Sequence, residues 1–84
     1  MKKIEGSDTP YRSIPCDTYS QLEIAILHRQ RLQLIWHDGN VSFVRTILPL
    51  DLETCSGQEF LHYRLPSGEL GRTRLDRIDR VEPV

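Results

Sequence analysis

Apolar residues between positions 16 and 30 recur at the spacing of an amphipathic α-helix. The residues of the inward stripe follow the i, i+3, i+4, i+7 rule. They are Tyr19, Leu22, Ala25, Ile26 and Arg29, with Ile24 and Leu27 widening the apolar arc. The residues expected to face water or a partner are Ser20, Gln21, Glu23 and His28. The pattern predicts one helix that lies across a sheet.

The start of this helix has two candidate capping registers. Asp17 or Thr18 can cap it, and Ser20 with Glu23 offers a capping box two or three residues later. Before it, Pro15 favours an extended backbone at the preceding residue, so residues 11–16 are expected to approach the helix as a short arm.

After the helix the pattern changes to the alternation of strands. Residues 32–36 alternate at period two, and Asp38-Gly39 is a strong signal for a tight hairpin. A return strand follows over 41–48, and Pro49 is expected to end or bend it because proline cannot donate to a central ladder. We therefore predict a β-hairpin here.

The rest of the chain predicts shorter strands joined by turns. Residues 49–58 are expected to form a loop, residues 59–65 a third strand, and residues 66–69 a turn. A fourth strand covers roughly 70–74. In the last segment Leu75, Ile78 and Val81 recur every three residues, which favours one 3-10 turn between two short strands and leaves a helix as the alternative.

Together these elements predict a mainly β (α+β) protein, in which an N-terminal helix is followed by about five short strands. Tight turns between short strands suit a small, bent, partly open β-barrel better than a sandwich. With 84 residues the chain can form one modest core. We expect a flexible leader over 1–10, which mixes charge, Gly, Ser and Pro without periodicity, and one domain over 11–84.

The overall charge is close to neutral. The chain has 11 basic and 12 acidic residues, so no global positive field draws it to nucleic acid. Cys16 and Cys55 lie too far apart for a Cys-x-x-Cys site and are expected to be reduced, mostly buried thiols. Because neither a signal peptide nor a transmembrane stretch is visible, we expect a cytoplasmic protein that does not enter a membrane.

No residue pattern predicts catalysis or metal binding. Cys16 or Cys55 would need a base, and His28, His37 and His62 stand in no catalytic or metal-ligand spacing. We therefore expect a non-catalytic protein without a cofactor or a bound metal.

Two sets of residues could bind nucleic acid. Trp36 could stack on a base, although a place in the core or at its rim is the simpler interpretation. The four arginines near the C-terminal end could contact an RNA backbone, but four acidic residues interleave with them and favour a self-neutralised surface. These arginines are Arg72, Arg74, Arg77 and Arg80, and the acidic residues are Glu69, Asp76, Asp79 and Glu82.

Acidic residues also gather at the start of the helix. The helix dipole favours Asp17 and Glu23 there without any functional role. The same carboxylates, presented beside Tyr19, could alternatively occupy a groove built for phosphates, because they offer Arg and Lys similar charge-assisted hydrogen bonds.

An ordered set of residues resembles the Rof family, small inhibitors of the transcription termination factor Rho. The family pattern is approximately Y-x-P-I-x-C-D-x-Y-D-x-L-E-x-A, then a histidine, a D-G hairpin and a late G-E-x(4)-R-L-D-x-I. The matching residues of this chain are Tyr11, Ile14, Cys16, Asp17, Tyr19, Leu22, Glu23, Ala25, His28, Asp38, Gly39, Gly68, Glu69, Arg74, Leu75, Asp76 and Ile78. The match covers nearly the whole chain after residue 10.

The resemblance implies an Sm-like barrel capped by an N-terminal helix. It also implies that the protein binds the RNA-binding N-terminal domain of Rho and keeps nascent RNA from engaging. We expect the protein to be a monomer. By analogy Asp17, Tyr19 and Glu23 would face the basic RNA site of Rho, with Cys16, Thr18 and Ser20 close by.

The chain also departs from the family pattern. Ser13 replaces a usual proline, and Thr18 and Ser20 stand where acidic residues are common, so the negative patch is thinner. An Sm-like module that binds single-stranded RNA is the alternative function, and a structural or tethering domain is the third.

Overall fold

The computed structural model describes residues 12–84, and for Asp38 the backbone alone. The predicted leader over 1–10 and Tyr11 lie outside the described residues. One helix, α1 (Cys16–His28), is followed by the strands β1 (Leu32–Asp38), β2 (Val41–Cys55), β3 (Gln58–Arg64) and β4 (Leu70–Arg74). A short 3-10 helix, η2 (Leu75–Arg77), then leads into β5 (Ile78–Pro83).

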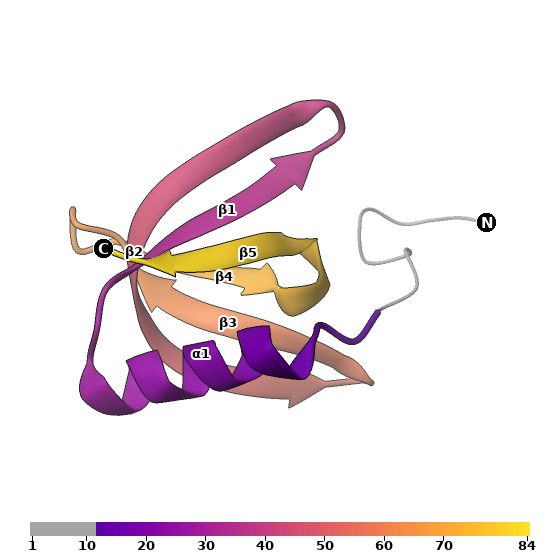
Figure 1. The fold of residues 1–84 in the computed structure, drawn as a ribbon, viewed down its shortest axis with the longest axis horizontal. Coiled ribbons are helices and arrows are strands. Elements are labelled where there is room, and N and C mark those ends of the chain that lie inside the picture. The colour runs from indigo at the N-terminus through magenta and orange to yellow at the C-terminus, as the bar shows by residue number, and fades with distance from the viewer. Residues whose placement is uncertain (1–11) are drawn as a thin grey trace.

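The five strands form one antiparallel sheet in the order β4-β3-β2-β1-β5. The long strand β2 belongs to both halves of the sheet, because its first part pairs with β1 and its second part pairs with β3. The register shifts between Pro49 and Asp51, where the two parts meet, and Figure 1 shows β2 changing direction between them. The sheet therefore curls into a small, bent, Sm-like barrel with β4 and β5 at its edges.

The bend in β2 corrects one prediction. Residues 49–58 do not form a loop, since β2 continues through Pro49 to Cys55 and a two-residue turn at Ser56-Gly57 leads into β3. A proline removes one ladder donor, and the register shift beside Pro49 accommodates that loss, so the strand bends without ending. Pro49 is itself buried.

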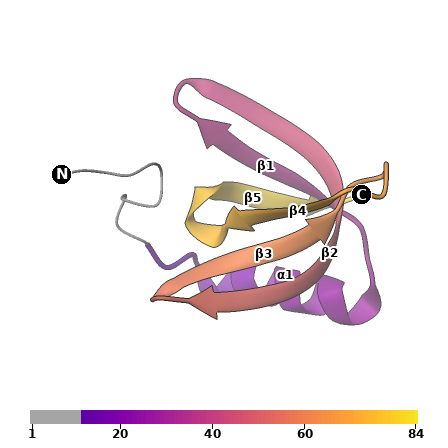
Figure 2. The ribbon, with the colours of Figure 1, turned by 180° about the vertical axis from the view of Figure 1, so that it is seen from behind.

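Helix α1 packs on the sheet through a narrow strip that contacts β2 and β5. Figures 1 and 2 show it lying across one face of the sheet. Leu22 and Ala25 are buried in the core, and Tyr19 and Ile26 pack beside them. The core cluster also takes residues from β1, β2, β3, η2 and β5: Leu32, Leu34, Ile47, Leu61, Leu75, Ile78 and Val81.

Three expectations for the helix were wrong. It begins at Cys16 after Pro15, without a side-chain cap, so neither predicted capping register is used. Ile24 and Leu27 do not widen the buried arc, because their side chains are 54% and 79% exposed. Arg29 is exposed too, since it adopts a left-handed backbone (φ 52°) and ends the helix there.

Several predicted features are confirmed. The hairpin turns at Gly39, whose φ of 64° suits glycine. The 3-10 turn lies between β4 and β5, and Leu75, Ile78 and Val81 are all buried. The prediction of a mainly β protein with one helix capping about five bent strands is therefore confirmed.

Candidate functional site: an acidic face at the helix start

The start of α1 and the hairpin between β2 and β3 lie at the same end of the molecule (Figure 1). The arm before the helix is tied there by a hydrogen bond in which the backbone N–H of Arg12 donates to Oδ2 of Asp76, at 3.2 Å. Ile14 on this arm packs against the core. The first helical turn is thus anchored from both sides, by the core below and by η2 beside it.

Two open hollows meet at Tyr19. The first, the helix-start hollow, has a volume of about 360 Å³ and is lined by Ile14, Cys16, Tyr19, Ser20 and Glu59. The second, the helix–strand hollow, has a volume of about 380 Å³ and is lined by Tyr19, Glu23, Ile26, Leu27, Asp51 and Leu52. No lysine, arginine or histidine is among these lining residues, so the charged groups of the two linings are all acidic.

The pKa of Tyr19 is affected by these carboxylates. Burial raises the pKa of Tyr19 above its ordinary value, and the carboxylates of Glu59 and Glu23 raise it further. Glu23 lies on the next turn of the helix, whereas Glu59 comes from β3. The two carboxylates therefore act on one phenol from two different elements.

We call the two hollows together with Asp17 the acidic face. It combines four carboxylates with an apolar floor, in which Leu27 is largely exposed and Leu52 is half-buried. Such a surface can accept the charged ends of lysine or arginine side chains while the floor contacts their aliphatic stems. The four acidic residues are Asp17, Glu23, Asp51 and Glu59.

Four of the six predicted site residues line these hollows. They are Cys16, Tyr19, Ser20 and Glu23. Asp17 is exposed on the first turn and Thr18 is half-buried, and both lie outside the linings. Cys16 and Cys55 are exposed free thiols, so the prediction of buried cysteines was wrong: Cys16 precedes the buried strip of the helix and Cys55 ends β2 beside a turn.

Sequence reasoning missed Asp51 and Glu59. They were placed in a loop and at the start of a strand, and only the bend of β2 brings this hairpin beside the helix. No local signal in the sequence predicts that approach, because it depends on the register shift at Pro49.

The other candidate chemical groups lie on the sheet. His62 Nε2 is 2.6 Å from Glu53 Oε1, and His37 Nδ1 is 2.8 Å from Asp79 Oδ1. Among the described side chains, no group of three or more His, Cys, Asp and Glu gathers closely enough to hold a metal ion. Within residues 12–84, no helix has the length and apolar character needed to cross a membrane.

The arginines near the C-terminal end are largely neutralised, as expected. Arg74 pairs with Asp76 and Arg80 with Glu82. Arg72 lies 3.9 Å from a Glu53 oxygen and stacks over the ring of Phe60 at 4.1 Å. This segment therefore presents little uncompensated positive charge.

An aromatic stack lies on the β1–β2 hairpin. Trp36 and Phe43 are paired across the strands, with ring centroids 5.2 Å apart and planes inclined by 20°. The guanidinium of Arg45 lies 5.8 Å from the Trp36 ring centroid. Trp36 packs partly against the core, and Phe43 is 37% exposed.

Comparison with known proteins shows a similar fold among solved structures but no family. No family model matches the chain, and no curated protein matches it. Among solved structures, proteasome accessory factor B/C (PafBC) of Arthrobacter aurescens is similar over 86% of this chain, with a TM-score of 0.74 and 20% sequence identity. The match spans 12% of the PafBC chain, and at this identity the likeness concerns the fold alone.

Proposed function

We propose that this protein is a non-catalytic inhibitor of Rho-dependent transcription termination, which binds the RNA-binding N-terminal domain of Rho through its acidic face. The observation that carries the proposal is the convergence of Glu23, Asp51 and Glu59 around Tyr19, with Asp17 exposed on the adjoining first turn of the helix. A surface of this charge is complementary to a basic cleft that normally holds RNA phosphates. Docking there would exclude RNA without any covalent step.

The resemblance to the Rof family provides the identity of the partner. The residues of this chain that match the family pattern at the helix start are those that line or border the acidic face. The departures at Thr18 and Ser20 are partly offset, because Asp51 and Glu59 add two carboxylates to the same surface from the sheet. The charge of the face therefore does not depend on the first helical turn alone.

The proposal is tested by affinity capture of Rho from the cell that encodes this chain. Wild-type protein should retain Rho at micromolar concentration in low salt and suppress its RNA-stimulated ATPase. Reversing the charge in Asp17→Lys should weaken capture by about tenfold, within the roughly 0.5 to 3 kcal/mol that a lost interfacial charge removes.

The matched control is Glu69→Lys, which makes the same charge change in the exposed β3–β4 turn at the other end of the molecule. It should capture Rho as the wild type does. The proposal fails if wild-type protein captures no Rho under these conditions, or if both variants lose Rho equally.

A second candidate function is a module that binds single-stranded RNA. The Trp36–Phe43 stack with Arg45 is the specific observation in its favour, because successive bases stack on aromatic platforms. RNA binding would appear as a salt-dependent shift in the mobility of an RNA oligonucleotide. The shift would be lost in Trp36→Ala and retained in Asp17→Lys. The pairing of Arg74 and Arg80 with carboxylates reduces the basic surface on which this candidate would depend.

A further inference from the structure

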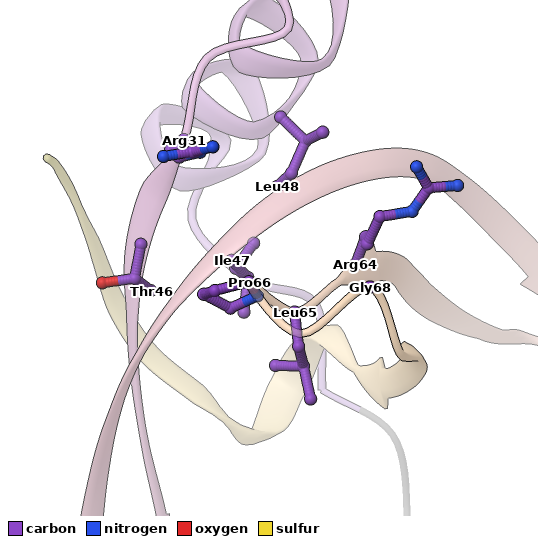
Figure 3. A pocket seen from close by; sticks show the side chains of 8 residues that line it. All are labelled: Arg31, Thr46, Ile47, Leu48, Arg64, Leu65, Pro66 and Gly68. Carbon is purple, nitrogen blue, oxygen red and sulfur yellow. The ribbon is translucent and has the colours of Figure 1, made fainter.

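A further pocket lies at the end of the molecule opposite the acidic face, where α1 ends and β3 turns into β4 (Figures 1 and 3). Its volume is about 240 Å³. The lining residues come from the α1–β1 link, the middle of β2 and the β3–β4 turn: Arg31, Thr46, Ile47, Leu48, Arg64, Leu65, Pro66 and Gly68. We call it the arginine pocket.

Two arginines bring positive charge to this pocket without an opposing carboxylate in its lining. Arg31 precedes β1 and Arg64 ends β3, and Figure 3 shows them on either side of Leu48. In the part of the chain that the structure describes, the arginine ion pairs involve Arg72, Arg74 and Arg80, and neither pocket arginine. The pocket therefore carries two positive charges that a ligand can meet.

Both arginines lie on hydrogen-bonded backbone segments. The helix end before Arg31 is closed by a hydrogen bond in which Gln30 N–H donates to the Ala25 carbonyl, at 2.8 Å. Arg64 pairs with Leu48 on β2 and with Leu70 on β4. The turn after it is closed by Leu65 N–H donating to the Glu69 carbonyl, at 2.8 Å. A ligand would thus meet guanidinium groups carried on fixed backbone segments.

The remainder of the lining is mostly apolar. Ile47 is buried, Leu48 and Leu65 are half-buried, and Pro66 lies at the edge. The hydroxyl of Thr46 is directed away from the other labelled side chains (Figure 3). Binding would therefore depend on the two guanidinium groups, with the carbon atoms of a ligand resting on the apolar residues.

We propose that the arginine pocket binds the terminal phosphate of a small phosphate monoester. A monoester carries a charge of about −1.5 to −2 at neutral pH, which matches two arginines, and its oxygens accept bidentate hydrogen bonds. A carboxylate or an internal phosphodiester carries one charge and leaves one arginine unmatched. The pocket volume lies below the roughly 300 to 1,000 Å³ of drug-sized sites, which favours a small ligand.

The test is a titration of the isotope-labelled full chain, followed by backbone amide NMR, with ribose 5-phosphate and glycerol 3-phosphate as probes. The amides of Arg31, Arg64 and Gly68 should shift saturably, with a dissociation constant on the order of 1 mM or lower. Ribose and glycerol should produce no such shifts. Absence of saturation with both phosphates would overturn the proposal.

Matched variants locate the site. Arg31→Gln and Arg64→Gln should each weaken binding by at least about tenfold, as expected for a lost charge-assisted hydrogen bond. Arg77→Gln, the same change at an exposed position on η2, should stay within about twofold of wild type. Equal losses in all three would show non-specific attraction and contradict the proposal.

A dinucleoside monophosphate without a terminal phosphate separates a small monoester from a nucleic-acid backbone. It should bind at least about tenfold more weakly than ribose 5-phosphate, and equal or tighter binding would overturn the assignment to a monoester. The inference is independent of the proposed Rho function, since both pocket variants should still capture Rho.

Discussion

At the scale of single residues, Tyr19 connects the core to the acidic face. Its ring packs against the core cluster, while its hydroxyl lies under the influence of Glu59 and Glu23. A tyrosine is neutral at physiological pH even at its ordinary pKa, and burial and both carboxylates raise the pKa of Tyr19 further, so the phenol is a hydrogen-bond donor. A neutral donor among carboxylates can contact a phosphate-binding cleft without adding charge.

The raised pKa of Tyr19 predicts a loss of stability at alkaline pH. Its contribution is fully present below the unfolded-state pKa of about 10 and is lost as pH rises through the higher folded-state value. The free energy of unfolding should therefore fall more steeply above about pH 10 in wild type than in Tyr19→Phe. Urea unfolding followed by Trp36 fluorescence measures this difference, and identical slopes in the two proteins would contradict it.

At the scale of elements, the turn between β4 and β5 is organised by an ion pair. Arg74 is 6% exposed, its Nε donates to Asp76 Oδ1 at 3.0 Å, and Asp76 also accepts the N–H of Arg12. Leu75 and Ile78 are buried beside this pair. The residues of the late R-L-D-x-I segment thus have a structural role here.

The Arg74–Asp76 ion pair predicts that a single isosteric substitution lowers the stability of the protein strongly. Asp76→Asn removes the charge facing a buried guanidinium, which typically costs about 3 to 5 kcal/mol of unfolding free energy. The control is Asp79→Asn, whose side chain is 44% exposed beside His37 and should cost at most about 1 kcal/mol. Urea unfolding of both variants measures the contrast, and similar losses in the two would show that Asp76 has no special role.

The sequence was sufficient to predict elements whose signals are local. The helical stripe apart from Arg29, the Asp-Gly turn and the spacing of Leu75, Ile78 and Val81 each depend on a few neighbouring residues and were confirmed. The course of β2 through Pro49 was not predictable, since a proline signals a break unless a register shift accommodates it.

The contrast between local signals and long-range packing also applies to the candidate site. The site residues at the helix start were predicted from the resemblance to the Rof family, and four of those six line the hollows. The positions of Asp51 and Glu59 depend on how the bent sheet packs against the helix, and no local sequence pattern predicts that long-range packing. The exposure of Leu27 was missed for a related reason: the helix contacts the sheet along a strip narrower than its apolar arc.

At the scale of the whole molecule, the two candidate sites lie at opposite ends. The acidic face lies at the start of α1, and the arginine pocket lies where the helix ends (Figure 1). With a formal net charge of −1 the chain as a whole has almost no field, so the two ends would act by local complementarity. A basic partner and an anionic ligand could therefore occupy the protein at the same time.

The most direct test of the central claim is to map the surface that contacts Rho by cross-saturation from unlabelled Rho to the isotope-labelled protein. The account predicts signal loss at Asp17, Tyr19 and Glu23 and at Asp51 and Glu59, with Arg31 and Arg64 unaffected. Signal loss confined to the Trp36–Phe43 hairpin or the arginine pocket would contradict it.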